Sequence, residues 1–172
     1  MTLKDYLIQL SCYHAWATQR MCDALEPLSN TDWHRDAGLF FGSVHRTVNH
    51  LLLTDQGWFL RIARGESFQL ALDTQLHAER APLIAAWRSA VPRWQPWLAD
   101  LDEARLSQQL QYTRANGQAV SIPFAQALGH QFNHATHHRG QVSAALTAFG
   151  HPALVMDWVY QMQQEQIGVP AP

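Results

Sequence analysis

The side chains best suited to chemistry in this sequence are four histidines that fall within nine residues, between His130 and His138. The segment that carries them reads as a helix, and residues four apart on a helix have Cβ atoms about 5–6 Å from each other. His134 and His138 can therefore bind one metal ion from one face. A third ligand could come from His50, on another predicted helix. The pattern predicts a metal site with these three histidines as ligands.

The angular positions of the histidines favour the interior of a helical bundle. At 100° per residue, His130, His134 and His138 span an arc of about 80°. In a chain with this many histidines, chance gives about 0.5 pairs of histidines four residues apart. The sequence has two such pairs, His130–His134 and His134–His138. A bundle interior disfavours charged imidazolium and favours neutral, metal-binding imidazole. The arc continues one heptad pattern, Phe124, Ala127, Gln131, His134, His138, Gln141 and Ala145.

The predicted helix around His50 has one polar stripe on an otherwise apolar surface. Thr47 and Thr54 flank His50 on this stripe, and small polar residues in such a place suggest the wall of a cavity. Three histidine ligands would leave one position on the ion open, as in catalytic rather than closed structural zinc sites.

The alternative is that the histidines are ordinary core residues. They would then be hydrogen-bonded to neighbours such as Asn49, Thr136 or Gln141. That reading is preferred for a single buried histidine. For three histidines on two facing helices, we favour a metal site.

Other polar residues are weaker candidates. His14 lies on the seam of the first helix and could be a fourth ligand or orient one, although packing is the commoner role. Asp55 falls about 140° from His50 and should face elsewhere. Arg61 and Arg139 could bind an anionic substrate, but structural or solvated arginines are commoner. No nucleophile–base pair or paired carboxylates identify a catalytic residue. The residues expected to orient ligands or line the cavity are His14, Thr47, Thr54, His130 and Gln141.

Length and composition indicate a globular chain of one domain, residues 1–172, with 47% hydrophobic and 15% charged residues. The net charge of −2 gives no reason to expect nucleic acid or an anionic membrane as partner. No apolar run approaches the roughly 20 residues of a membrane span. Cys12 and Cys22 lie about 15 Å apart on one predicted helix, too far to bridge. These features favour the cytoplasm.

The periodicity predicts an all-α fold, a four-helix bundle with a small hairpin before the fourth helix and a short C-terminal helix. Pro92 and Pro96 should kink or end the third helix early. Asn116-Gly117 should form a type I′ turn in the hairpin. The predicted elements are helices at 3–25, 43–64 and 76–98, a hairpin at 109–122, and helices at 123–149 and 157–166.

Nearly the whole chain resembles the DinB-like family of helical-bundle metalloproteins, often grouped with the YfiT-type metal-dependent hydrolases. The specific stretch is Phe-Asn-His-Ala-Thr-His-His-Arg-Gly-Gln at residues 132–141, supported by residues 41–58. Residues 13–17 resemble the first helix of the family, where an asparagine is commoner than His14. The role of position 14 therefore stays open.

The resemblance implies one long crossover connection and one divalent metal ion, usually nickel or zinc, held by three histidines. These map onto His50, His134 and His138. Some relatives are thiol S-transferases that use a low-molecular-weight thiol, others are isomerases, and relatives are often homodimers. The tryptophan-rich segment 87–97, with more aromatic surface than one bundle face needs, also favours a homodimer.

We expect a metal-dependent enzyme that transfers a low-molecular-weight thiol to an electrophilic small-molecule substrate. The open metal position would lower the pKa of the thiol, and the thiolate would react in a cavity lined by Thr47, Thr54 and Gln141. One alternative is a hydrolase that uses metal-bound hydroxide. Another is a non-catalytic, metal-binding protein of a stress response.

Overall fold

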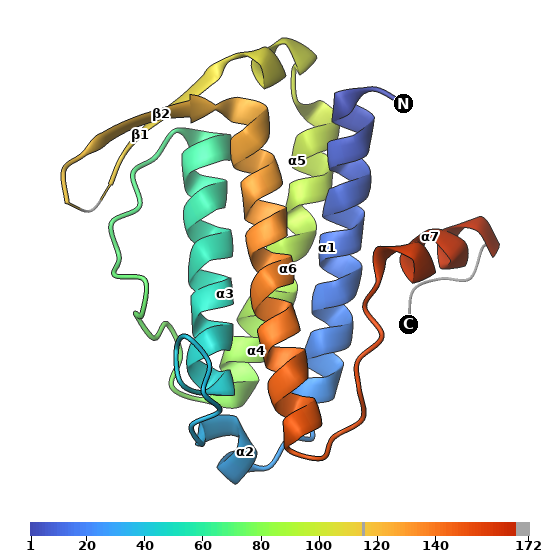
Figure 1. Ribbon diagram of the computed structural model, residues 1–172. Helices are drawn as coiled ribbons and strands as arrows, with labels where there is room; N and C mark the ends of the chain where they lie inside the picture. The colour runs from blue at the N-terminus through green and yellow to red at the C-terminus, as the bar shows by residue number, and fades with distance from the viewer. Residues whose placement is uncertain (115, 168–172) are drawn as a thin grey trace.

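The computed structural model describes residues 1–114 and 116–167. This part of the chain forms a bundle of four long helical segments with a two-stranded hairpin at one end (Figure 1). None of its helices is long and apolar enough to cross a membrane. The predicted four-helix bundle is confirmed. Its segments are α1 (Leu3–Leu25), α3 (Val44–Phe59), α4 (Arg80–Ala90) continued by α5 (Trp94–Asp100), and α6 (Phe124–Ala148).

The order of the helices around the bundle requires one long return connection. α1 packs against α6 and the α4–α5 segment, and α3 packs against α6 and α4. α1 and α3 therefore occupy opposite corners. α3 and α4–α5 run in the same direction, so the chain must travel back along the bundle between them (Figure 1). Residues 65–79 make this extended crossover, as the resemblance implied.

Helix ends follow the local signals in the sequence. Thr2 and Asp5 form a reciprocal capping box at the start of α1. The Ser43 side chain accepts a backbone N–H from the first turn of α3. A wider π-helical turn, η1 (Leu60–Arg64), continues α3 up to Gly65, which has a φ of 66°. Glycine takes this left-handed conformation without steric cost, and Gly65 is the C-cap of this helical segment.

The third predicted helix differs from the expectation at its start. It begins at Arg80 rather than at residue 76, because the preceding residues belong to the crossover. Pro92 interrupts it, as expected, since proline lacks the N–H that a continuous helix needs. The chain tightens there into a 3₁₀ turn, η2 (Val91–Arg93), before α5 begins.

The hairpin is present, but its turn is not the predicted type. β1 (Gln109–Thr113) pairs with β2 (Ala119–Pro123), and Thr113 lies opposite Ala119. A type I′ turn needs positive φ at two successive residues. Gly117 has a φ of 81°, whereas no non-glycine residue in the described part of the chain has a positive φ. A longer loop, closed by a hydrogen bond from the Arg114 N–H to the Gln118 carbonyl at 2.9 Å, replaces it.

Three short helices complete the fold. The C-terminal helix α7 (Trp158–Ile167) lies within a residue of the prediction. Two others were not predicted, because a single turn is too short to show a hydrophobic period. They are α2 (Asn30–His34), capped by Ser29, and the 3₁₀ turn η3 (Glu103–Ser107), capped by Asp102.

Tryptophans fill the core rather than the surface. Trp87 and Trp94 are fully buried, and Trp97 is partly buried. Segment 87–97 therefore does not present the aromatic surface that favoured a homodimer. The homodimer remains a prediction, now without that support.

Candidate metal centre

Three histidine side chains converge between α3 and α6. His50 lies on the second turn of α3, and His134 and His138 lie one turn apart on α6. His50 Nε2 is 3.2 Å from His134 Nε2, and one nitrogen from each ring lies within 4.8 Å of the other two. A tetrahedral ion with metal–nitrogen bonds of about 2.0–2.1 Å separates its ligand atoms by roughly 3.4 Å. The distances between the three nitrogens are thus close to those between the ligand atoms of one bound ion.

Hydrogen bonds behind two of the rings fix their orientation. His50 Nδ1 donates to the Leu72 carbonyl of the crossover at 2.8 Å, and His138 Nδ1 donates to Gln141 Oε1 at 2.8 Å. With Nδ1 protonated, Nε2 carries the lone pair that a metal ion needs. Gln141, expected at the site from the sequence, therefore acts by orienting His138.

Burial keeps the cluster neutral. It lowers the pKa of His50 to about 4 and that of His134 to about 3, with a further lowering from the neighbouring imidazoles. Burial also lowers the pKa of His138. His134 Nδ1 is buried and has no hydrogen-bond partner among the described residues. Neutral imidazoles that face one point are a donor set suited to a divalent transition metal.

A phenylalanine that the sequence reasoning did not single out covers the cluster. The Phe41 ring stacks on His50, with centroids 4.0 Å apart, and lies 5.7 Å from His138. Phe41 occupies a tight turn, in which Gly42 has a φ of 81° and its carbonyl accepts the N–H of Ala37. The ring forms one wall of the centre.

Other predicted residues lie near the cluster without joining it. The His130 ring packs edge-on against Trp58 at 5.0 Å and lies 5.6 Å from the ring of His134. The nitrogens of His130 are not part of the three-histidine group that could hold a metal ion. The hydroxyls of Thr47 and Thr54 donate to carbonyls of their own helix, and both side chains are buried. Both hydroxyl protons are thus used within α3.

His14 belongs to a separate buried network. Its Nδ1 accepts a hydrogen bond from Arg139 Nη1 at 2.8 Å, and its Nε2 lies 3.2 Å from Asp55 Oδ1. All three side chains are 1% exposed. Because both ring nitrogens have partners, His14 is a structural residue here. Asp55 faces away from His50, as predicted, and Arg139 is structural.

Asp55 is the centre of this network. Besides His14, its carboxylate accepts hydrogen bonds from Trp94 at 2.8 Å, Gln131 at 3.2 Å and Arg93 at 3.0 Å. These partners come from α1, α6 and the η2–α5 segment. The network ties the helices together, and it commits the carboxylate to four side-chain donors.

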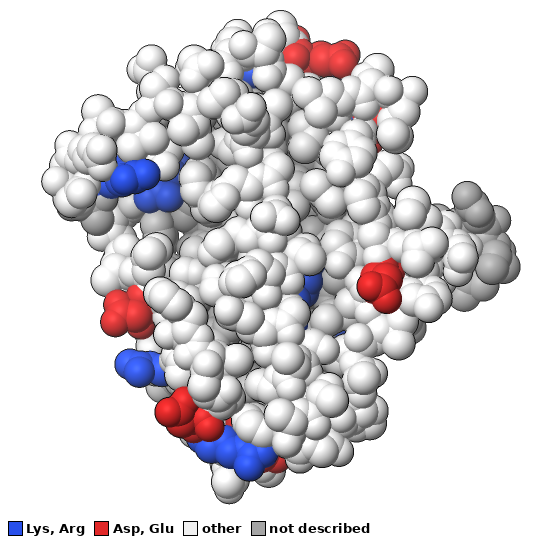
Figure 2. Space-filling model, viewed as in Figure 1, with Lys and Arg blue, Asp and Glu red and all other residues white. Residues whose placement is uncertain are grey.

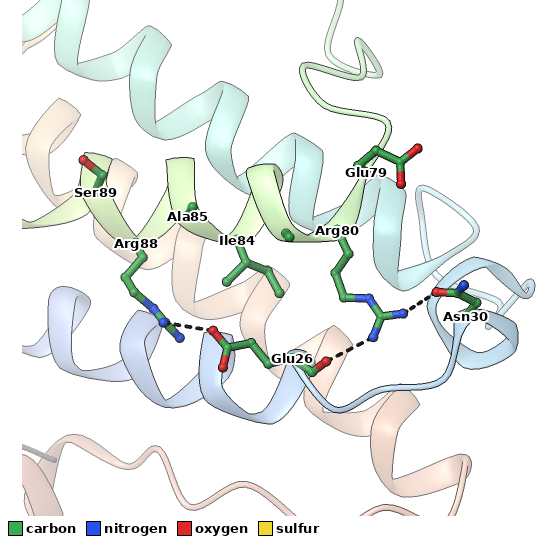
Figure 3. A pocket seen from close by; sticks show the side chains of 9 residues that line it. Glu26, Asn30, Glu79, Arg80, Ile84, Ala85, Arg88 and Ser89 are labelled. Atoms are coloured by element: carbon green, nitrogen blue, oxygen red, sulfur yellow. Dashed lines mark hydrogen bonds and ion pairs between the residues drawn. The ribbon is translucent and has the colours of Figure 1, made fainter.

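A cavity of about 730 Å³ lies between the end of α1 and α4, away from the histidines (Figure 3). Its two arginines already have partners. Arg80 donates to the Glu26 carbonyl and to Asn30, and Arg88 forms an ion pair with the Glu26 carboxylate at 3.0 Å. No histidine or cysteine lines this cavity. It therefore offers no comparable chemistry.

Comparison with known proteins agrees with the architecture. The model of the DinB family matches residues 1–169. Protein DinB from Bacillus subtilis (strain 168) is 26% identical over 161 residues, which cover 91% of this chain and 93% of that protein. The structure of YfiT from Bacillus subtilis is similar, with a TM-score of 0.66 and 15% identity over 87% of this chain and 89% of that chain. YfiT is described as "a probable metal-dependent hydrolase with an unusual four-helix bundle topology". The match over almost the full length shows that this chain belongs to the DinB family.

Proposed function

We propose that this protein is a metal-dependent enzyme that transfers a low-molecular-weight thiol to an electrophilic small molecule. The observation that carries the proposal is the convergence of His50, His134 and His138 on one point. A divalent ion held by three imidazoles would keep a position open and lower the pKa of a thiol bound there. Imidazole ligands suit both nickel and zinc.

The described groups around the cluster do not supply the carboxylate base of a metalloprotease, whereas neither thiol transfer nor metal-bound hydroxide needs one. Among the described residues, the cluster contains three histidines and no Asp or Glu. The nearby buried carboxylate, Asp55, is occupied by four side-chain donors. Metalloproteases use a glutamate as general base to activate water. A thiol of lowered pKa needs no such base.

The surrounding residues hold the site ready for substrate. The Leu72 carbonyl and Gln141 keep the rings of His50 and His138 aimed at one point. The Phe41 ring stacks on His50 and covers that side of the imidazole. Rigid support of this kind preserves a reactive geometry while substrates exchange.

Metal-dependent hydrolysis is the second candidate. It is favoured by the fold shared with YfiT, which is described as a probable metal-dependent hydrolase. The two functions differ in whether a thiol is consumed.

A direct test uses the metal-loaded protein with a panel of cellular thiols and one electrophile, such as an alkyl halide or a quinone, beside a panel of esters and amides. We expect conjugation above background with at least one thiol. The activity should disappear in His50→Ala and after chelation, and should return with added metal. His137→Ala, an exposed neighbour, is the control that keeps activity. Ester or amide cleavage alone would support the hydrolase. A metal-loaded protein without either activity would contradict both.

A further inference from the structure

A half-buried arginine on η1, the π-helical continuation of α3, lies near the face that carries His50 and has no acidic partner among the described residues. Arg61 follows His50 by eleven residues, which brings it back to within about 20° around the helix. Its Nη2 donates to the Phe68 carbonyl at 2.9 Å, and its buried Nε has no partner. Within the described part of the chain, no carboxylate forms an ion pair with Arg61. Arg64, by contrast, pairs with Glu66.

Aromatic rings, rather than a counter-ion, contact the Arg61 guanidinium. It lies 4.7 Å from the Tyr112 ring centre, 5.3 Å from that of Trp58 and 5.8 Å from that of Phe68. The Phe68 ring lies against Gly57, where an added Cβ would meet it at 2.5 Å. These contacts stabilise the cation without neutralising it, so its charge stays available to a ligand.

A row of rings connects this arginine with the metal ligands. Trp58, which contacts Arg61, lies 5.0 Å from the ring of His130. His130 in turn lies 5.6 Å from the ring of His134. A small molecule with an apolar body could lie along Trp58 and His130 and reach both the guanidinium and the metal centre.

The surface around the hairpin has the charge and space for an anion. Arg114, on the hairpin, bonds to Gln118 and is in no ion pair with the described carboxylates. In Figure 2, the upper-left part of the molecule, where the hairpin lies, shows basic atoms and no acidic atoms. A cavity of about 520 Å³ between the hairpin and the start of the crossover is lined by Gly65, Ser67 and Tyr112, among others, and adjoins Arg61 through the Tyr112 ring.

We infer that Arg61 recognises a carboxylate on the substrate, whose apolar part extends along Trp58 and His130 toward the histidines. The inference rests on the proposed function, because it names the class of its electrophilic substrate as an anionic small molecule. Arg61 Nη1 has no hydrogen-bond partner among the described residues. A carboxylate bound there would make a charge-assisted hydrogen bond to a planar donor that the rings already hold.

The test measures binding of benzoate, with benzamide as its uncharged counterpart, by calorimetry on the metal-loaded protein. We expect benzoate to bind more tightly than benzamide. Arg61→Gln should weaken benzoate binding by roughly 10- to 100-fold and leave benzamide unchanged. Arg64→Gln removes the same charge one turn away and should leave both affinities unchanged.

Two further measurements separate the possible outcomes. His134→Ala should retain benzoate binding, because the anion is held by Arg61. Loss in His134→Ala but not in Arg61→Gln would mean that the carboxylate binds the metal, and would overturn the inference. An NMR titration of the unmodified protein should move the Trp58 indole resonance, assigned with Trp58→Phe. If that resonance does not move, the inference fails, whether or not Arg61→Gln folds.

Binding of benzoate needs no turnover, so this test is independent of thiol transfer. Conjugation activity without recognition of benzoate would leave the proposed function standing and overturn the role of Arg61. Recognition of benzoate without conjugation would support the role of Arg61 and contradict the proposed function.

Discussion

The metal-free protein should lose stability as the pH falls from about 6.5 to about 4. Burial lowers the pKa of His50 to about 4, from the value of 6.5 that it regains in the unfolded chain. Between these two values, the unfolded chain binds a proton that the folded chain does not. Falling pH then favours unfolding. The stability that His50 contributes is complete above pH 6.5 and is lost through this window.

The size of the effect follows from the two pKa values. A difference of about 2.5 in pKa corresponds to about 3.4 kcal/mol once the pH lies below 4. At pH 5 the loss from His50 alone is about 2 kcal/mol. His134, with a pKa of about 3, adds a loss of the same sign, although neighbouring rings do not titrate independently. The loss of about 2 kcal/mol from His50 is already a large part of a typical unfolding free energy of about 5–15 kcal/mol.

Urea unfolding of chelator-treated protein at pH 7, 6 and 5 measures this loss. His50→Leu removes one titrating ring and should lose less stability between pH 7 and pH 5 than the unmodified protein. His137→Gln changes an exposed histidine on α6 and should behave like the unmodified protein. An unfolding free energy that stays constant or rises toward pH 5, or an equal drop in His50→Leu, would refute the reasoning.

Three other predictions concern single residues. Asp55→Asn should lower the unfolding free energy by about 3–5 kcal/mol, because the buried His14 and the partly buried Arg93 lose the negative charge of their partner; a loss below about 1 kcal/mol in urea would count against the network. Gly57→Ala should destabilise by about 1–3 kcal/mol because of the contact with Phe68, whereas Gly140→Ala, which meets nothing within 4 Å, should stabilise by up to about 1 kcal/mol. Equal effects of the two glycine substitutions would contradict that packing. Gln141→Ala should weaken metal affinity by roughly 10- to 100-fold in a competition titration, and an unchanged affinity would exclude its orienting role.

The helices could be predicted because their signals are local. α1 and α6 have apolar periods that run their full length, and Gly65 ends its helix where the sequence places a C-cap. The start of the third helix at Arg80 could not be predicted, because it depends on where the crossover ends. The Asn116-Gly117 turn was misread since that dipeptide also suits a longer loop with one left-handed glycine.

The candidate ligands could be predicted because helical spacing alone places His134 beside His138. The groups that orient and cover them could not. Leu72 contributes a backbone carbonyl, which leaves no mark in the sequence, and Phe41 depends on the shape of a turn. The pairing of His14 with Asp55 joins residues 41 positions apart and appears only when α1 packs against its neighbours.

Metal content is the most direct test of the central claim. After chelation and reloading with zinc or nickel, elemental analysis should find one ion per chain in the unmodified protein and in His130→Ala and His137→Ala. It should find none bound stably in His50→Ala, His134→Ala or His138→Ala. Full metal retention by correctly folded His134→Ala protein, or no metal in the unmodified protein, would contradict the assignment of the three histidines as the metal centre.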